Sequence, residues 1–178
     1  DDIWYYGQLN RTTWFDAGIN RHPLATSGGY LYSHENGPND GQPLGVAPLP
    51  MSAYIQSAFM DIADGEFYML TKRVIPDVDF TASETIDPVT GATLVNAVNM
   101  AVAVTKFPGA ASQTTDVAGT TLTRNVTTAT GSIDQYTNQV FIRARGRQMN
   151  FKISSDTLGT QWQLGDTRVD AQPDGKRG

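Results

Sequence analysis

Carboxylates in two short clusters are the side chains best placed for acid–base chemistry: Asp61, Asp64 and Glu66, then Asp77 and Asp79. Glycoside hydrolysis needs two carboxyl groups that face one cleft, about 5–10 Å apart. The first cluster has the composition of a turn, and Asp77 follows Pro76 at the end of an expected strand. Structural roles are therefore favoured over an enzyme acting on a cell-surface polymer, and we expect no enzymatic activity.

Candidate metal ligands are few. His22 and His34 lie twelve residues apart, without a carboxylate or a cysteine at the spacing of a zinc site. The chain has no cysteine, which excludes thiolate ligands and a cysteine nucleophile. The segment 36–40 offers oxygen atoms to calcium but lacks the alternating Asp pattern of a dedicated loop. The sequence therefore predicts neither a metal nor another cofactor.

Positive charge gathers near the C-terminus in four residues: Arg143, Arg145, Arg147 and Lys152. Such a set can contact phosphates or the carboxylates of a partner. It can equally be the solvated or self-paired face of a strand, whose charges keep the sheet edge from pairing with other chains. Both interpretations stay open at this point.

Four aromatic residues are candidates for a binding surface: Trp14, Tyr30, Tyr32 and Trp162. Aromatic rings on a surface can stack on a glycan. Packing in a core explains the same residues equally well. The sequence therefore makes glycan binding an alternative function without favouring it.

The basic residues lie in the longest strand-forming segment, residues 136–153. Apolar residues alternate there with polar ones, and this period of two indicates a strand. We expect one long strand bulged at Gly146, because a two-residue hairpin favours Asn-Gly or Asp-Gly. The bulge would turn Arg147 away from Arg143 and Arg145, which predicts a split basic strip suited to carboxylates of a neighbouring chain rather than a DNA groove.

The remaining elements are short strands separated by turns. Strand patterns occur at 53–57, 67–75 and 99–106, and residues 87–91 form a turn. The Thr- and Ser-rich segment 110–132 is interpreted as a surface loop with one edge strand. At the N-terminus, residues 3–6 and 12–15 suggest a hairpin and residues 29–34 a further strand, a rhythm shared by propeller blades and simple hairpins.

Residues 36–50 are rich in Gly and Pro, so we expect a linker without regular strand pairing. This linker divides the chain into a blade-like segment with its linker, 1–48, and a second domain, 49–178. The strand count and turn spacing of the second domain predict an antiparallel β-sandwich. The expected fold is therefore all-β, a β-sandwich preceded by a short propeller-blade-like or hairpin segment.

Composition narrows the class of protein further. The 178 residues carry a net charge of −5, and only 17% of them are charged. This acidic, weakly charged surface does not favour tight binding to DNA phosphates. No run of eighteen apolar residues occurs, so we expect no membrane span. Because the chain starts with Asp1-Asp2 and no Met, we expect it to be part of a larger chain.

Several segments resemble the tail nozzle or tail-tube structural proteins of short-tailed bacteriophages: residues 53–57 through 73–77, 139–159, 162–165, 168–170 and 173–177. The N-terminal Trp/Tyr segment is similar to the last blade of the propeller that those proteins carry. The absent upstream propeller and the insert 110–132 depart from that pattern.

The resemblance implies a non-enzymatic virion component of the phage tail, made in the host cytoplasm. It implies a ring of copies, commonly a hexamer, that conducts or seals the DNA channel. Other tail proteins would be its partners, and DNA would pass only transiently. The alternative function is a carbohydrate- or receptor-binding β-sandwich module.

Overall fold

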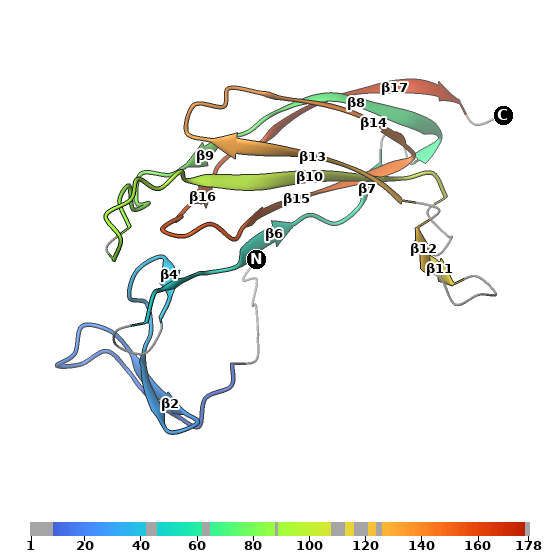
Figure 1. Cartoon of the computed structure of the whole chain (residues 1–178). Coiled ribbons are helices and arrows are strands. Elements are labelled where there is room, and N and C mark those ends of the chain that lie inside the picture. The colour runs from blue at the N-terminus through green and yellow to red at the C-terminus, as the bar shows by residue number, and fades with distance from the viewer. Residues whose placement is uncertain are drawn as a thin grey trace.

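The computed structural model describes residues 9–41, 46–61, 65–87, 89–107, 113–115, 121–123 and 126–176 (Figure 1). No α-helix occurs in these residues, and every strand pair among them is antiparallel. The prediction of an all-β chain is confirmed. Within this part of the chain there is also no helix long and apolar enough to cross a membrane.

The N-terminal sheet has three strands in the order β1-β2-β3: β1 (Thr13–Phe15), β2 (Leu24–Ser27) and β3 (Tyr30–Ser33). Gly28 and Gly29 join β2 to β3 with φ angles of 57° and 84°, which only glycine adopts without strain. The expected partner of β1, residues 3–6, lies outside the described residues. β2, which the sequence reading missed because Pro23 interrupts the pattern, pairs with β1 along Phe15↔Leu24 to Thr13↔Thr26.

The linker contains a short strand pair, so the expectation that it lacks regular pairing is wrong. β4 (Asn39–Asp40) pairs with β5 (Leu49–Pro50), and Pro50 is tolerated because it sits at the end of an edge strand. The Asn39 side chain fastens the linker to two distant loops. Its amide donates to Glu84 Oε2 at 3.0 Å, and its oxygen accepts from the Gly159 amide at 2.6 Å.

The largest sheet runs in the order β13-β10-β15-β6, with β7 (Met60–Asp61) also on β15. The four strands are β13 (Val126–Asp134), β10 (Ala97–Thr105), β15 (Gln148–Ser155) and β6 (Ala53–Gln56). β13 lies at one edge and β6 at the other, and β13 pairs with β10 over its whole length. The edge strand expected within 110–132 is present, because β13 lies at the sheet edge from residue 126 onward. The hairpin of β11 (Gln113–Thr115) and β12 (Thr121–Thr123) precedes it.

A second sheet has the order β14-β8-β17: β14 (Val140–Gly146), β8 (Phe67–Ile75) and β17 (Arg168–Lys176). β9 (Val78–Asp79) and β16 (Gln163–Leu164) form a short pair beyond it. Figure 1 shows this sheet lying over the larger one, with the N-terminal sheet set apart from both. We call the two larger sheets and their connections, residues 53–176, the body.

The predicted bulged strand around Gly146 is two strands in two sheets, so that prediction is wrong in its pairing. β14 pairs with β8, whereas β15 pairs with β10, and Arg147 alone separates them. The crossing passes close to β10: the Arg147 amide donates to Thr105 O at 2.7 Å. A Cβ on Gly146 would lie 2.8 Å from both Thr105 O and Val104 Cβ. Glycine is therefore required because the backbone of β10 fills the space of a side chain.

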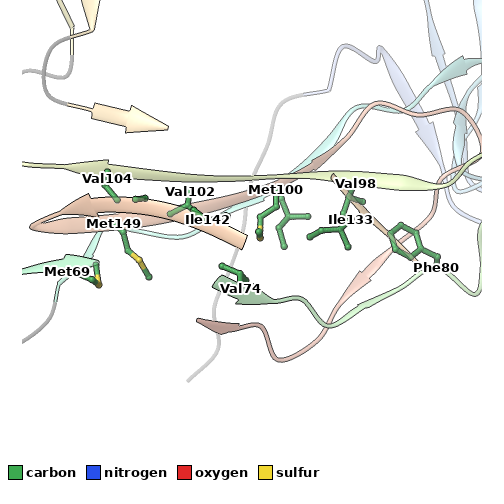
Figure 2. Packing of buried hydrophobic residues seen from close by; sticks show 12 residues of the cluster. Met69, Val74, Phe80, Val98, Met100, Val102, Val104, Ile133, Ile142 and Met149 are labelled. Carbon is green, nitrogen blue, oxygen red and sulfur yellow. The ribbon is translucent and has the colours of Figure 1, made fainter. Parts of the chain in front are cut away.

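The hydrophobic core lies between the two sheets of the body (Figure 2). β10 supplies the inward row Val98, Met100, Val102 and Val104, each no more than 2% exposed. Side chains of the other sheet and of β13 and β15 meet this row: Met69, Val74, Ile133, Ile142, Ala144, Met149 and Ile153. Burial of one such aliphatic side chain stabilises the fold by roughly 1.5–3 kcal/mol. The alternation predicted for 140–153 thus points its apolar face into this core.

Candidate functional site

The outer face of the β14-β8-β17 sheet carries a concentration of positive charge. Register places Phe141 opposite Arg73, and Arg73 opposite Asp170, while Val74 and Ala144 point to the core on the other side. The charged residues of this outer face are Lys72, Arg73, Arg143, Arg145, Arg168, Asp170 and Asp174. We call them the basic face. Only Arg143 and Arg145 were singled out from the sequence; the others alternate with core residues of β8 and β17, and that alternation could have found them.

Two ion pairs cross the basic face. Arg73 Nε lies 3.1 Å from Asp170 Oδ2, and Arg145 Nε lies 2.5 Å from Asp174 Oδ2. The Arg145 guanidinium also lies over the Tyr68 ring, 4.4 Å from its centroid. All four charged side chains are substantially exposed, so each pair contributes only about 0.2–1 kcal/mol. Arg145 is therefore already paired with a carboxylate of its own chain.

The other cations of the basic face are more available. Lys72 Nζ donates to Gln172 Oε1 at 2.7 Å, a bond to a neutral group. Arg143 and Arg168 are exposed and have neither an ion pair nor a hydrogen bond to any described residue. Their charges are therefore free to meet carboxylates from outside.

Arg147 and Lys152 do not belong to this face. Arg147 donates to Gly65 O through Nε and Nη2, at 3.0 and 2.7 Å. Lys152 lies on β15 in the other sheet, with Nζ 4.4 Å from the centroid of the Tyr54 ring. The structure thus divides the four basic residues identified in the sequence between the outer face of the β14-β8-β17 sheet, the crossing from β14 to β15, and the largest sheet.

Charge is unevenly distributed over the described residues. The basic face holds five cations and two carboxylates, whereas the rest of the described side chains hold five cations and twelve carboxylates. A net-positive sheet face therefore belongs to a molecule that is otherwise acidic. Such surfaces are complementary to one another.

Of the carboxylates considered for catalysis, Asp64 lies outside the described residues, and the others come from separate parts of the chain. Asp61 on β7 accepts from Gln148 Nε2 at 3.4 Å, and Asp77 Oδ2 accepts from the Asp166 amide at 3.1 Å. Asp79 on β9 accepts from the Thr81 hydroxyl and amide, and these bonds lower the pKa of its carboxyl. Glu66 precedes β8. In the described part of the chain, His, Asp and Glu nowhere gather in a group of three that could hold a metal ion.

Turns of the body use two further carboxylates in the same way. The Thr90 hydroxyl and the Val89 amide donate to Asp87 and lower the pKa of its carboxyl. The Thr137 hydroxyl and the Tyr136 amide do the same for Asp134. The predicted turn at 87–91 is confirmed, with Gly91 at φ 70°. These carboxylates fix turns.

Apolar side chains lie exposed along the N-terminal part of the molecule. On and around the N-terminal sheet these are Leu9, Trp14, Phe15, Ile19, Tyr30 and Leu31; in the linker and along the β6 edge they are Val46, Leu49, Met51, Tyr54, Ile55, Phe59 and Met60. Within 9–41 and 46–61, the residues described in this part of the chain, Pro23 and Ala25 are the only buried apolar residues. Exposed apolar surface of this extent is typical of an interaction site.

The predicted aromatic residues are partly brought together. Tyr30 and Tyr32 line a cavity of about 710 Å³ beside the linker, and Trp162 lines a cavity of about 740 Å³ beside β6. Glu35, Gly37 and Met51 line both cavities, so the two adjoin. Trp14 lines neither and instead packs on His34, with ring centroids 4.8 Å apart. Glu35 and Tyr54, which also line these cavities, carry no sequence pattern that would have revealed them.

No family model, curated protein or solved structure matches this chain.

Proposed function

We propose that this chain is a non-enzymatic structural protein that assembles head to tail with copies of itself. The observation that carries the proposal is the distribution of charge. The basic face of one copy and the acidic remainder of the next are complementary, and such a contact joins two different surfaces. Contacts of this kind close into rings or extend into filaments.

Exposed apolar surface supports the same proposal. Exposed side chains that line neither cavity, among them Trp14, Phe15, Phe59 and Met60, would be desolvated by a neighbouring copy. Apolar burial supplies affinity, whereas complementary charge supplies orientation and specificity. The two kinds of surface together describe one interface with an apolar and a charged part.

The fold and the setting follow from the resemblance described above. We propose that the body is a β-sandwich and that the N-terminal sheet corresponds to strands of a propeller blade. In this proposal the ring is a nozzle or tube in the tail of a short-tailed bacteriophage, where other tail proteins adjoin it and DNA passes transiently.

The test removes positive charge from the basic face without removing an ion pair or a hydrogen bond to another described residue. The double variant Arg143→Gln, Arg168→Gln loses two cations that have no partner among the described residues. We expect its self-association, measured by sedimentation velocity and electron microscopy, to weaken by about tenfold or more relative to the parent chain. Added salt should weaken the parent assembly in the same direction.

The matched control removes the same charge elsewhere. The exposed residues Arg21 and Lys106 also have no ion pair with the described residues and lie outside the basic face, so Arg21→Gln, Lys106→Gln should not weaken self-association. A parent chain that stays monomeric at every concentration and salt would contradict the proposal. So would equal effects of the two double variants.

A further inference from the structure

We propose that the two adjoining cavities form one binding groove for a neutral or N-acetylated oligosaccharide. This inference goes beyond assembly and concerns a different surface from the basic face. The N-terminal sheet and the linker line one half of the groove, and the linker, β6 and the residues around β16 line the other half. Cavities of this size accommodate small organic ligands.

Each half of the groove has an exposed aromatic ring on its wall. Tyr30 is 59% exposed in one half, and Tyr54 is 65% exposed in the other. Tyr32 is less available, because the Arg11 guanidinium lies 4.1 Å from its ring centroid. A pyranose ring has an apolar face of C–H groups that stacks on such an aromatic surface. Tyr30 and Tyr54 therefore provide two stacking positions along one groove.

Polar groups without internal partners line the same walls. Glu35, Asn36 and Asp40 line the first cavity, and their side chains make no hydrogen bond with the described residues. The exposed side chains of Gln161 and Gln163 line the second and are likewise unbonded to the described residues. Carboxylates accept hydrogen bonds, and amides both donate and accept. This combination suits the paired hydroxyl groups of a sugar.

Glu35 occupies the wall shared by both cavities in a strained conformation. Its φ is 56°, the only positive value at a described residue other than glycine. A left-handed conformation costs an ordinary residue roughly 1–2 kcal/mol. Strained residues cluster at binding and catalytic sites, and this strain supports a role for the Glu35 side chain in the groove.

The charge of the groove selects among saccharides. Glu35 and Asp40 have no ion-pair partner in the described structure. The cation on the wall, Arg11, already donates to His34 Nε2 at 3.1 Å and covers Tyr32. Arg11 keeps its charge, but two carboxylates against one cation leave the wall net negative, so the binding of a uronic acid or another anionic sugar would be opposed. Neutral and N-acetylated sugars meet no such repulsion.

The experiment screens the full chain on an array of neutral, N-acetylated and uronic-acid oligosaccharides. The tightest neutral or N-acetylated oligosaccharide is then titrated by calorimetry, with tryptophan fluorescence as a second signal because Trp162 lines the groove. We expect Tyr30→Ala and Glu35→Gln each to weaken its binding about tenfold.

A second substitution at Glu35 separates binding from folding. Glu35→Gly removes the carboxylate and also the backbone strain, so it should weaken binding while leaving the melting temperature unchanged or higher. Tyr136→Ala serves as the aromatic control, because Tyr136 is 79% exposed and lines neither cavity. It should bind as the parent chain does.

Three outcomes would overturn the proposal. The first is an array on which no neutral or N-acetylated oligosaccharide binds. The second is binding that Tyr30→Ala and Glu35→Gln leave unchanged. The third is self-association that these two variants abolish, which would show that a second copy occupies the groove. Because the basic face is not altered, failure here leaves the assembly test described above intact.

Discussion

The N-terminal part, residues 9–50, and the body differ in how they use apolar residues. The body buries a cluster of apolar side chains between two sheets, whereas the described residues of the N-terminal part bury only Pro23 and Ala25 and expose aromatic and aliphatic side chains. A small sheet that buries so few apolar side chains has little stability of its own. The body is therefore the self-sufficient unit, and the N-terminal part depends on contacts that reach beyond its own strands.

The largest expected effect comes from a matched pair at the edge of the body. Ile153 on β15 and Ile55 on β6 lie opposite each other in the register, yet Ile153 is 0% exposed and Ile55 is 49% exposed. We expect Ile153→Ala to lower the free energy of unfolding by about 2–5 kcal/mol. Ile55→Ala should cost about 1 kcal/mol or less. Urea denaturation measures both.

Varying the protein concentration gives a second test of the difference between Ile55→Ala and Ile153→Ala. If copies cover the β6 edge, Ile55→Ala will cost more at high concentration than at low concentration, because association adds to apparent stability. Ile153→Ala should cost the same at both. If both substitutions lowered the free energy of unfolding by the same large amount at low concentration, that result would contradict the exposure of Ile55 at the β6 edge.

The body was more predictable from sequence than the N-terminal part. Strand patterns at 67–75 and 99–106 correspond to β8 and β10, because alternation of core and solvent residues is strong where a sheet has one buried face. In β13, by contrast, Thr and Gly dilute the alternation, and pairing with β10 decides the structure. Local composition alone cannot report that pairing.

The basic face and the change of sheet at Gly146 both depend on contacts between distant parts of the sequence, which local patterns do not predict. The residues of the basic face come from three strands that are distant in sequence, and only register brings Arg73 opposite Asp170. The change of sheet at Gly146 depends on its closeness to Thr105, which period-two patterns do not encode. Residue types supplied the candidate side chains, and topology determined which of them meet.

A smaller effect is expected when the hydrogen bonds that join the N-terminal part to the body are removed. Asn39→Ala removes the hydrogen bonds to Glu84 and Gly159, each worth about 0.5–1.5 kcal/mol. The body should keep its unfolding midpoint, while amide hydrogens of β5 and the N-terminal sheet exchange faster. Hydrogen exchange with mass spectrometry separates the two regions.

Asn36→Ala is the matched control for that variant, because Asn36 lies in the same linker and makes no hydrogen bond with the described residues. It should leave exchange unchanged. Unaltered exchange in Asn39→Ala as well would mean that other contacts hold the N-terminal part in place. Neither substitution should slow the unfolding of the body, and slower unfolding would contradict the role assigned to Asn39.

The smallest effect is acid sensitivity of the body through its turn carboxylates. Hydroxyl and amide donors lower the pKa of Asp79, Asp87 and Asp134 in the folded chain. The unfolded chain then binds more protons at acidic pH, so these groups contribute stability above the ordinary Asp pKa of about 3.9. That contribution is lost as pH falls toward and through the lowered values. Asp134→Asn, which cannot ionise, should show a flatter decline of the urea midpoint below about pH 4 than the parent chain, and an identical decline would show that the bonds to Asp134 do not form.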